Sequence, residues 1–216
     1  MKIIGINGSP RKKWNTATLL IKALEGAASQ GADTELVHLY DLNFQGCKSC
    51  FACKIINGRH NGRCALKDDL SSILKKIEDE ASAIIMGTPI YFGSMTGEMR
   101  SFLERLMFAP LIYSQPPRSL FPRRIKTGMI YTMNATEEMS AERNYDLMFS
   151  STEAYLRMVF GEAETFCCYD TYQFPDYSKI IFEYMDPAKK ALRRKEVFPD
   201  DCRKAFEFGY RIAFGT

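Results

Sequence analysis

Short hydrophobic runs alternate along the chain with longer segments in which hydrophobic residues recur every three or four positions. The short runs predict buried strands at 2–7, 34–40, 82–87, 125–132 and 164–169. The longer segments predict helices at 16–30, 70–77, 99–106 and near 143–160, and from Pro187 onward with a break at Pro199. Strands that alternate with helices predict an α/β fold, a doubly wound, five-stranded parallel sheet with helices on both faces.

The composition favours one globular domain over residues 1–216, with a cysteine-rich insertion at 43–67 and a C-terminal helical extension at 187–216. Hydrophobic residues make up 46% of the chain and charged residues 25%, as in ordinary globular proteins. The net charge of +3 gives no reason to expect nucleic-acid binding. No run approaches the roughly 18 apolar residues that cross a bilayer, and the N-terminus lacks the order of a signal peptide. We therefore expect a cytoplasmic protein that binds neither nucleic acid nor membranes.

Three loops should lie at the carboxyl ends of the strands, where sheets of this kind bind ligands. In the first loop, 8–15, the start of a helix offers unpaired N–H groups that suit a phosphate. Side-chain donors in and just after this loop are Ser9, Arg11, Asn15, Thr16 and Thr18. The sequence matches neither G-x-x-x-x-G-K-[ST] nor G-x-G-x-x-G, which favours a single terminal phosphate over a nucleoside triphosphate or a pyrophosphate. A helix cap followed by a turn is the simpler alternative.

The second loop, 88–96, combines a stiff backbone with aromatic surface. Pro89 stiffens the chain, while Gly93 allows a ligand to approach the backbone closely. Tyr91 and Phe92 would present aromatic surface to a flat heteroaromatic ring. The alternative is that the two aromatic residues pack between the loop and the next helix.

Taken together, the patterns Gly8-Ser9-Pro10-Arg11 with Asn15-Thr16, and 88–95, resemble the NADPH-dependent FMN reductase family of flavodoxin-like proteins. The resemblance covers about residues 1–135. It implies that the first loop holds the FMN phosphate and that the second lies along the isoalloxazine ring. The third loop differs from its relatives in lacking glycine, and Asn134 remains a candidate donor to the flavin edge. The implied FMN-binding residues are Ser9, Arg11, Asn15, Thr16, Thr18, Pro89, Ile90, Tyr91, Phe92, Gly93 and Asn134.

Four of the seven cysteines are closely spaced, at Cys47, Cys50, Cys53 and Cys64. Close spacing of this kind suits a [4Fe–4S] cluster, and it resembles the iron–sulfur flavoproteins of the same family, although their fourth cysteine usually comes sooner. Zinc with His60 in place of one thiol, and thiols without any metal, are the alternatives. We expect the remaining cysteines, Cys167, Cys168 and Cys202, to pack in the core.

The resemblance implies an FMN-binding oxidoreductase that passes electrons from NAD(P)H to a small-molecule or protein acceptor. No side chain need act as acid or base, because the flavin carries the chemistry. One alternative is an iron–sulfur flavoprotein that exchanges electrons with ferredoxin, and another is a non-enzymatic thiol redox sensor or scaffold. The family and the apolar segment 107–121 also suggest a homodimer or higher homo-oligomer.

Overall fold

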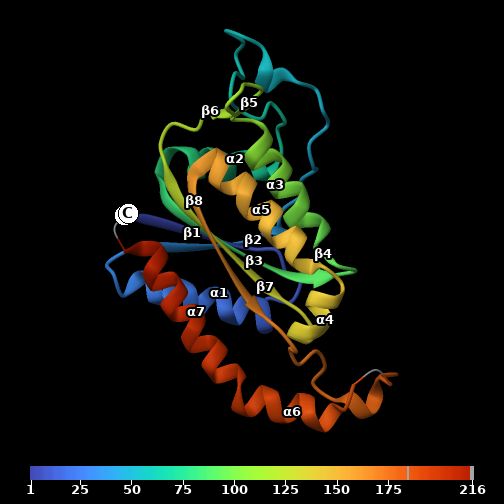
Figure 1. The fold of residues 1–216 in the computed structure, drawn as a ribbon. Helices are drawn as coiled ribbons and strands as arrows, with labels where there is room; N and C mark the ends of the chain where they lie inside the picture. The colour runs from blue at the N-terminus through green and yellow to red at the C-terminus, as the bar shows by residue number, and fades with distance from the viewer. Residues whose placement is uncertain (184, 215–216) are drawn as a thin grey trace.

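The computed structural model describes residues 1–183 and 185–214, and within these ranges five parallel strands form a sheet of order β2-β1-β3-β7-β8 (Figure 1). A short strand, β4, pairs with β3 in the antiparallel direction. The strands are β1 Lys2–Asn7, β2 Asp33–His38, β3 Ala81–Tyr91, β4 Ser94–Met95, β7 Ile125–Thr132 and β8 Gly161–Cys168. The predicted doubly wound α/β fold is confirmed, with β4 as an addition to the five expected strands.

Helices cover both faces of this sheet (Figure 1). One face is covered by α1 and α7, which pack on Ile3, Ile85 and Ile130. On the other face, α2, α3 and α5 pack on Ile4, Ile84 and other buried strand residues. The helices are α1 Asn15–Ala28, α2 Asp69–Glu80, α3 Gly97–Phe108, α4 Glu137–Glu142, α5 Tyr145–Phe160, α6 Pro187–Glu196 and α7 Phe198–Ala213.

The C-terminal helix breaks where proline predicts it. Helix α6 ends at Glu196, and α7 begins at Phe198 with Pro199 in its first turn, where a missing N–H costs nothing. The last two positions of the predicted extension, 215–216, lie outside the described residues. No helix in the described part of the chain is both long and apolar enough to span a bilayer.

Three segments for which the sequence predicts no strand or helix contain regular structure. The segment 88–96 was expected to be irregular, but β3 continues to Tyr91 and the chain returns as β4. Pro89 is tolerated because it lies near the end of the strand, opposite Thr132. The segment 109–124 contains a small hairpin, β5 Leu111–Ile112 with β6 Arg118–Ser119, and α4 occupies most of the third loop. Strands of two residues are too short to show the alternation of hydrophobic and polar positions that predicts a strand.

Candidate functional site

The three strand-end loops meet at one edge of the sheet. The Gly8 N–H donates to the Gly87 carbonyl at 2.8 Å, and the Thr96 hydroxyl donates to the Gly8 carbonyl at 2.7 Å. The Thr16 and Thr132 hydroxyls lie 2.7 Å apart, which joins α1 to the end of β7. The structure therefore brings the predicted phosphate loop, the aromatic loop and the third loop together, as the parallel topology requires.

The first turn of α1 is open to an anion. Its N-cap residue, Trp14, makes no side-chain capping bond, and the first turn contains no acidic residue. The N–H groups at the start of this helix therefore keep both their hydrogen-bonding capacity and the positive end of the helix dipole. Ser9 is buried beside this turn, where its hydroxyl accepts from the Arg11 N–H at 3.2 Å.

The predicted phosphate donors differ in whether their hydrogen-bonding groups are already used within the protein. Arg11 is exposed and its guanidinium lies 4.1 Å from the centre of the Trp14 ring. The Asn15 side-chain amide instead donates to the Tyr172 carbonyl at 2.7 Å. Only the backbone N–H of Asn15 therefore remains to bind a phosphate. Thr16 shares its hydroxyl bond with Thr132, and Thr18 is half-buried one turn further along α1. Backbone N–H groups, Ser9 and Arg11 thus remain the strongest donors.

The second loop is a tight hairpin with a strained tip. Tyr91 pairs with Ser94, and the two residues between them have positive φ angles, 51° at Phe92 and 78° at Gly93. This conformation is typical of a two-residue hairpin turn but is costly for phenylalanine, by roughly 1–2 kcal/mol. The Phe92 side chain is fully exposed, so packing does not offset that cost. A strained, exposed aromatic residue at a strand end indicates a role in binding.

The third loop contributes Asn134, which is half-buried. Its Oδ1 atom is buried without a hydrogen-bond partner among the described residues. The Asn134 carbonyl accepts from the Lys190 ammonium at 2.8 Å. An unpartnered buried acceptor at this edge fits a ligand that donates a hydrogen bond, such as a flavin ring N–H.

The four closely spaced cysteines form a second candidate site, beside the C-terminal half of α3. All four face one narrow cavity together with Phe108 and Arg105. Helix α3 starts at the hairpin of the second loop and extends on the order of 18 Å, so the cavity lies well away from Phe92. Among the described residues, no three His, Cys, Asp or Glu side chains converge closely enough to hold a metal ion.

A buried arginine supports this cavity. The Arg105 side chain is fully buried, and its Nε donates to the Cys64 sulfur at 3.3 Å. Its Nη1 donates to the Asp68 carboxylate at 2.5 Å and to the Gln45 carbonyl at 3.1 Å. Burial alone would raise the pKa of Asp68, but the bond and charge of Arg105 outweigh it and hold that pKa below its ordinary value. The local sequence predicts neither the burial of Arg105 at this cavity nor its contact with Cys64.

The donor set has the chemistry of an iron–sulfur cluster. The four thiols that line this cavity would supply one ligand to each of four irons, and a buried N–H donor to a ligand sulfur is a usual companion of such clusters. The Nη2 atom of Arg105 is also buried without a partner among the described residues. Nη2 lies on the same edge of the planar guanidinium as Nε, so this edge can donate one further hydrogen bond.

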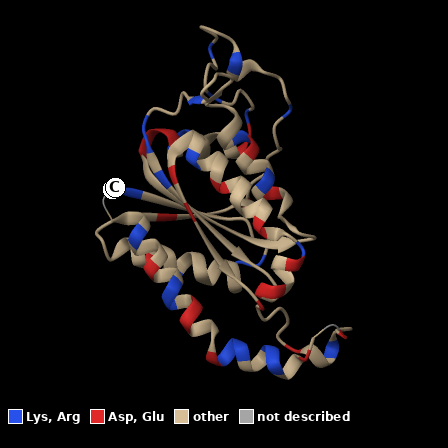
Figure 2. Ribbon diagram, viewed as in Figure 1, with Lys and Arg blue, Asp and Glu red and all other residues tan. Residues whose placement is uncertain are grey.

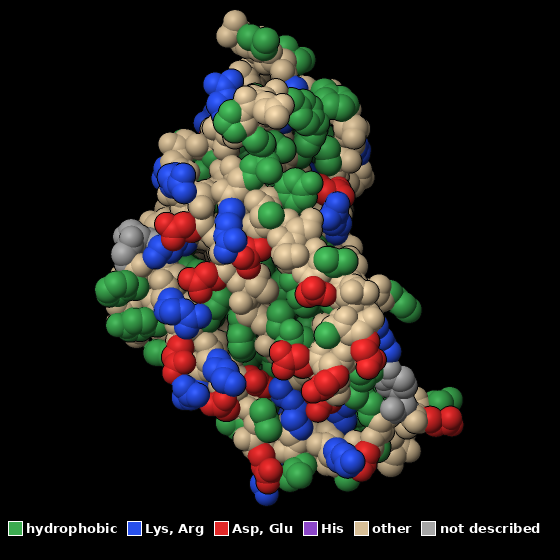
Figure 3. All heavy atoms as spheres, viewed as in Figure 1, with side chains coloured by type: hydrophobic (Ala, Val, Ile, Leu, Met, Phe, Trp, Pro, Cys, Tyr) green, Lys and Arg blue, Asp and Glu red, His purple; other side chains and the backbone are tan. Residues whose placement is uncertain are grey.

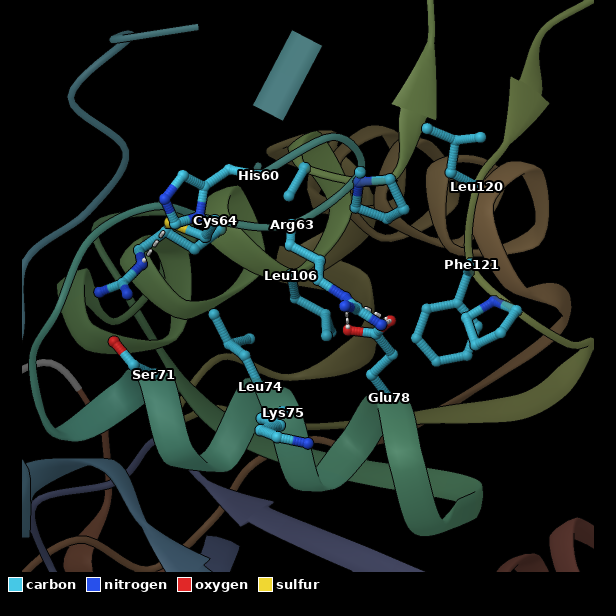
Figure 4. Close-up of a pocket in the computed structure, with 15 residues that line it drawn as sticks. His60, Arg63, Cys64, Ser71, Leu74, Lys75, Glu78, Leu106, Leu120 and Phe121 are labelled. Atoms are coloured by element: carbon cyan, nitrogen blue, oxygen red, sulfur yellow. Dashed lines mark hydrogen bonds and ion pairs between the residues drawn. The ribbon is translucent and has the colours of Figure 1, made fainter. Parts of the chain in front are cut away.

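A larger cavity, drawn in Figure 4, adjoins the cysteine cavity. Cys64 and Arg105 line both cavities. His60 lies in this larger cavity, beside Cys64, rather than with the other three cysteines. Arg63 reaches across it to Glu78 on α2, at 2.6 Å. A zinc site that includes His60 would therefore require the side chains to rearrange.

Burial makes Cys53 and the three cysteines outside the cavity poor nucleophiles. Burial raises the pKa of the Cys53 thiol and that of Cys202, and raises the pKa of Cys167 to about 11. Burial also raises the pKa of Cys168, which packs in the core with Asp201 3.3 Å from its sulfur. Cys167 and Cys202 are half-buried against the two core clusters, so the prediction that these three residues pack in the core is confirmed.

Comparison with known proteins identifies relatives over most of the chain. Residues 1–164 match the model of the family described as NADPH-dependent FMN reductase. An iron–sulfur flavoprotein of Methanocaldococcus jannaschii is 36% identical over 142 residues, 66% of each chain. One of Archaeoglobus fulgidus is 40% identical over 109 residues, 50% of each chain. The chain thus spans half to two thirds of the length of these curated relatives.

Solved structures share the fold at low sequence identity. An NAD(P)H:quinone oxidoreductase from Methanothermobacter marburgensis has a TM-score of 0.73 at 14% identity and covers 100% of this chain and 98% of its own. An FMN-dependent NADH-azoreductase from Bacillus anthracis, in complex with FMN, has a TM-score of 0.66 at 12% identity, covering 99% of this chain and 100% of its own. At these identities the likeness concerns the fold alone.

Proposed function

Because the chain belongs to the NADPH-dependent FMN reductase family, we propose that it is an FMN-binding oxidoreductase of the cytoplasm that transfers electrons from NAD(P)H to a small-molecule or protein acceptor. The observation that carries this proposal is the pairing of an uncapped helix N-terminus with a strained, exposed Phe92 at the same edge of the sheet. The first suits a terminal phosphate and the second a flat ring.

The residues of this chain would bind and orient FMN rather than react with it. The first turn of α1, with Ser9 and Arg11, would hold the phosphate. Backbone groups from Pro89 to Gly93 would lie along the ring, and the buried Oδ1 of Asn134 would accept from its edge. When bound, FMN would supply the chemistry of electron transfer between a nicotinamide and an acceptor. No side chain is assigned as a catalytic acid or base.

Binding and turnover test this proposal directly. Protein stripped of flavin is titrated with FMN and with riboflavin, and oxidation of NADH and NADPH is followed in the presence of a quinone or a ferric chelate. We expect micromolar or tighter FMN binding, weaker riboflavin binding, and FMN-dependent oxidation of at least one nucleotide. Protein that takes up neither flavin would contradict the proposal.

We also propose that Cys47, Cys50, Cys53 and Cys64 hold a [4Fe–4S] cluster, which would supply single-electron transfer when bound. The shared cavity and the buried Arg105 donor support this assignment, as does the similarity to proteins named iron–sulfur flavoproteins. The seven cysteines are all free thiols, as a reducing compartment favours. For a protein that contains this cluster, ferredoxin is a candidate partner in electron transfer.

Iron content distinguishes an FMN reductase without a cluster from an iron–sulfur flavoprotein. Protein purified without air should contain about four irons and four acid-labile sulfides per chain. Cys53→Ser should lose most of both, whereas Cys202→Ser, a half-buried thiol on α7, should keep them. Full flavin content with no iron in the wild-type protein would leave the reductase proposal standing and reject the cluster.

A further inference from the structure

The segment 169–196, of which position 184 lies outside the described residues, follows the last strand and lies beyond the region that matches the family model, which ends at residue 164. It runs from the end of β8 into α6, a helix whose surface is rich in Lys and Arg (Figure 2). We call it the C-terminal strap. It contacts both the first and the third of the loops proposed to bind FMN.

Its first contact is with the phosphate loop. The Tyr172 carbonyl accepts from the Trp14 indole at 3.0 Å and from the Asn15 amide at 2.7 Å. From α6, the Arg194 Nη1 donates to the Asn15 Oδ1 at 2.7 Å. Both ends of the Asn15 amide are therefore held by the strap, which sets the orientation of the first residue of α1.

Its second contact is with the third loop. Lys190 has only 2% of its side chain exposed, and its ammonium donates to the Asn134 carbonyl and to the Asp170 carboxylate. Backbone bonds add to this contact, from the Thr171 N–H to the Met133 carbonyl and from the Asp170 N–H to the Ala135 carbonyl. The strap thus fixes the main chain on both sides of Asn134.

Arg194 differs from Lys190 in its charge balance. The buried Lys190 ammonium is paired with Asp170, whereas in the described part of the chain no carboxylate forms an ion pair with Arg194. The Arg194 guanidinium lies 3.8 Å from the Phe198 ring centre and 6.0 Å from that of Trp14, so it is partly withdrawn from solvent. Among the described residues its hydrogen-bond acceptor is the neutral amide of Asn15, so a positive charge remains unbalanced beside the N-terminus of α1.

We propose that Arg194 is a positioning residue of the phosphate subsite: it orients Asn15 at the start of α1 and adds positive charge where a phosphate dianion would lie. The inference rests on the proposed FMN function and extends it to a helix outside the matched family region. It follows that the preference for FMN over riboflavin, which lacks the phosphate, depends on α6.

Flavin titration of the full-length protein with Arg194→Gln tests this inference. We expect FMN affinity to fall about tenfold, the usual worth of one charge-assisted contact, and riboflavin affinity to change less than about twofold. Arg194→Lys should recover part of the FMN affinity, because it keeps the charge. Lys195→Gln is the matched control, since it removes the same charge from an exposed position of the same helix and should leave both affinities unchanged.

The ratio of FMN to riboflavin affinity is measured within each protein, so a partly unfolded variant does not distort it. A ratio in Arg194→Gln equal to that of the wild type would overturn the inference and leave the FMN function intact. An equal fall of both affinities would also overturn it, because Arg194 would then act only through general folding. A wild-type protein that binds no flavin would reject the proposed function itself.

Discussion

At the scale of one residue, Phe92 has a backbone conformation and an exposure that do not stabilise the fold. Its backbone is in the left-handed region at φ 51°, and its side chain is fully exposed. Neither property stabilises the folded chain, since the first costs energy and the second buries no apolar surface. A glycine would adopt the same conformation without strain.

Phe92→Gly should therefore move stability and flavin binding in opposite directions. We expect an unfolding free energy equal to that of the wild type or higher by up to about 1 kcal/mol. FMN affinity should fall about two- to tenfold, because an aromatic contact is worth roughly 0.5–1.5 kcal/mol. Urea unfolding and flavin titration measure the two effects. Ile56→Ala, at another exposed apolar position, is the control, and unchanged FMN affinity in Phe92→Gly would reject the stacking role.

His38 is connected through Asn7 to the predicted phosphate loop. The Asn7 amide lies 2.8 Å from the His38 Nδ1, and the Asn7 Oδ1 accepts from the Ser9 N–H at 3.1 Å. Burial, and then the charge of Lys12, lower the pKa of His38 below its ordinary value of 6.5. In the unfolded chain the pKa returns to that value, so as pH falls the unfolded state takes up the proton first and the folded state loses stability.

Between about pH 7.5 and pH 5.5, His38 should therefore lower the unfolding free energy, by at most about 1 kcal/mol because its hydrogen bond to Asn7 is only partly buried. His38→Gln does not titrate and can still accept from Asn7, so its stability should depend less on pH. Urea unfolding at the two pH values measures this difference. His60→Gln, at the other histidine, should keep the wild-type pH dependence. Identical pH dependence in wild type and His38→Gln would show that His38 plays no such role.

At the scale of elements, the contact between α1 and α7 depends on two glycines. A Cβ atom added at Gly209 would lie 1.7 Å from the Ala23 carbonyl oxygen, and one added at Gly26 would lie 2.0 Å from the Phe206 carbonyl oxygen. The two helix backbones thus approach more closely than any side chain permits. This contact lets both helices cover one face of the sheet.

Gly209→Ala should destabilise the protein although alanine is the better helix former. The propensity gain of about 1 kcal/mol cannot offset the separation of two packed helices, and we expect a net loss of about 2–3 kcal/mol in urea unfolding. Gly97→Ala is the control, because nothing lies within 4 Å of a Cβ atom there. Equal stability of the two variants would mean that the helices can move apart at little cost.

The elements also mark where prediction from sequence succeeded and failed. The strand at 125–132 was predicted to the residue, because seven of its eight positions are buried between helices and neighbouring strands. The extension of β3 through Pro89 to Tyr91 was missed, since proline at a strand end reads as a loop. The partners of Arg123 could not be read from its local sequence either, because it donates to three carbonyls at the end of α2, those of Ile77, Glu78 and Ala81.

At the scale of the whole molecule, exposed hydrophobic side chains gather at the end that carries the cysteine-rich segment and the β5–β6 hairpin (Figure 3). They include Phe51, Ile55, Ile56, Tyr113 and Leu120. An apolar surface of this kind favours a contact with a second copy of the chain, as the segment 107–121 predicts. Homodimerisation remains a prediction, as does the division of residues 1–216 into one domain with an insertion and an extension.

Light scattering at micromolar concentration tests the homodimer. The wild type should have twice the mass of one chain, and Ile56→Asp combined with Tyr113→Asp should have the mass of one, because burying two carboxylates at an apolar contact is unfavourable. Ile181→Asp, at an exposed position outside this surface, should remain a dimer. A wild-type protein that stays monomeric would contradict the prediction.

By itself, the sequence determined the order and type of the main elements, the edge of the sheet where a ligand would bind, and the residue types offered there. These features are local, because hydrophobic periodicity and loop composition are properties of neighbouring residues. Only the tertiary structure decided that Arg194 holds Asn15, 179 positions away, and that Arg105 reaches Cys64. Such contacts depend on which elements pack together, and the chain encodes that packing jointly in all its buried surfaces rather than in any one segment.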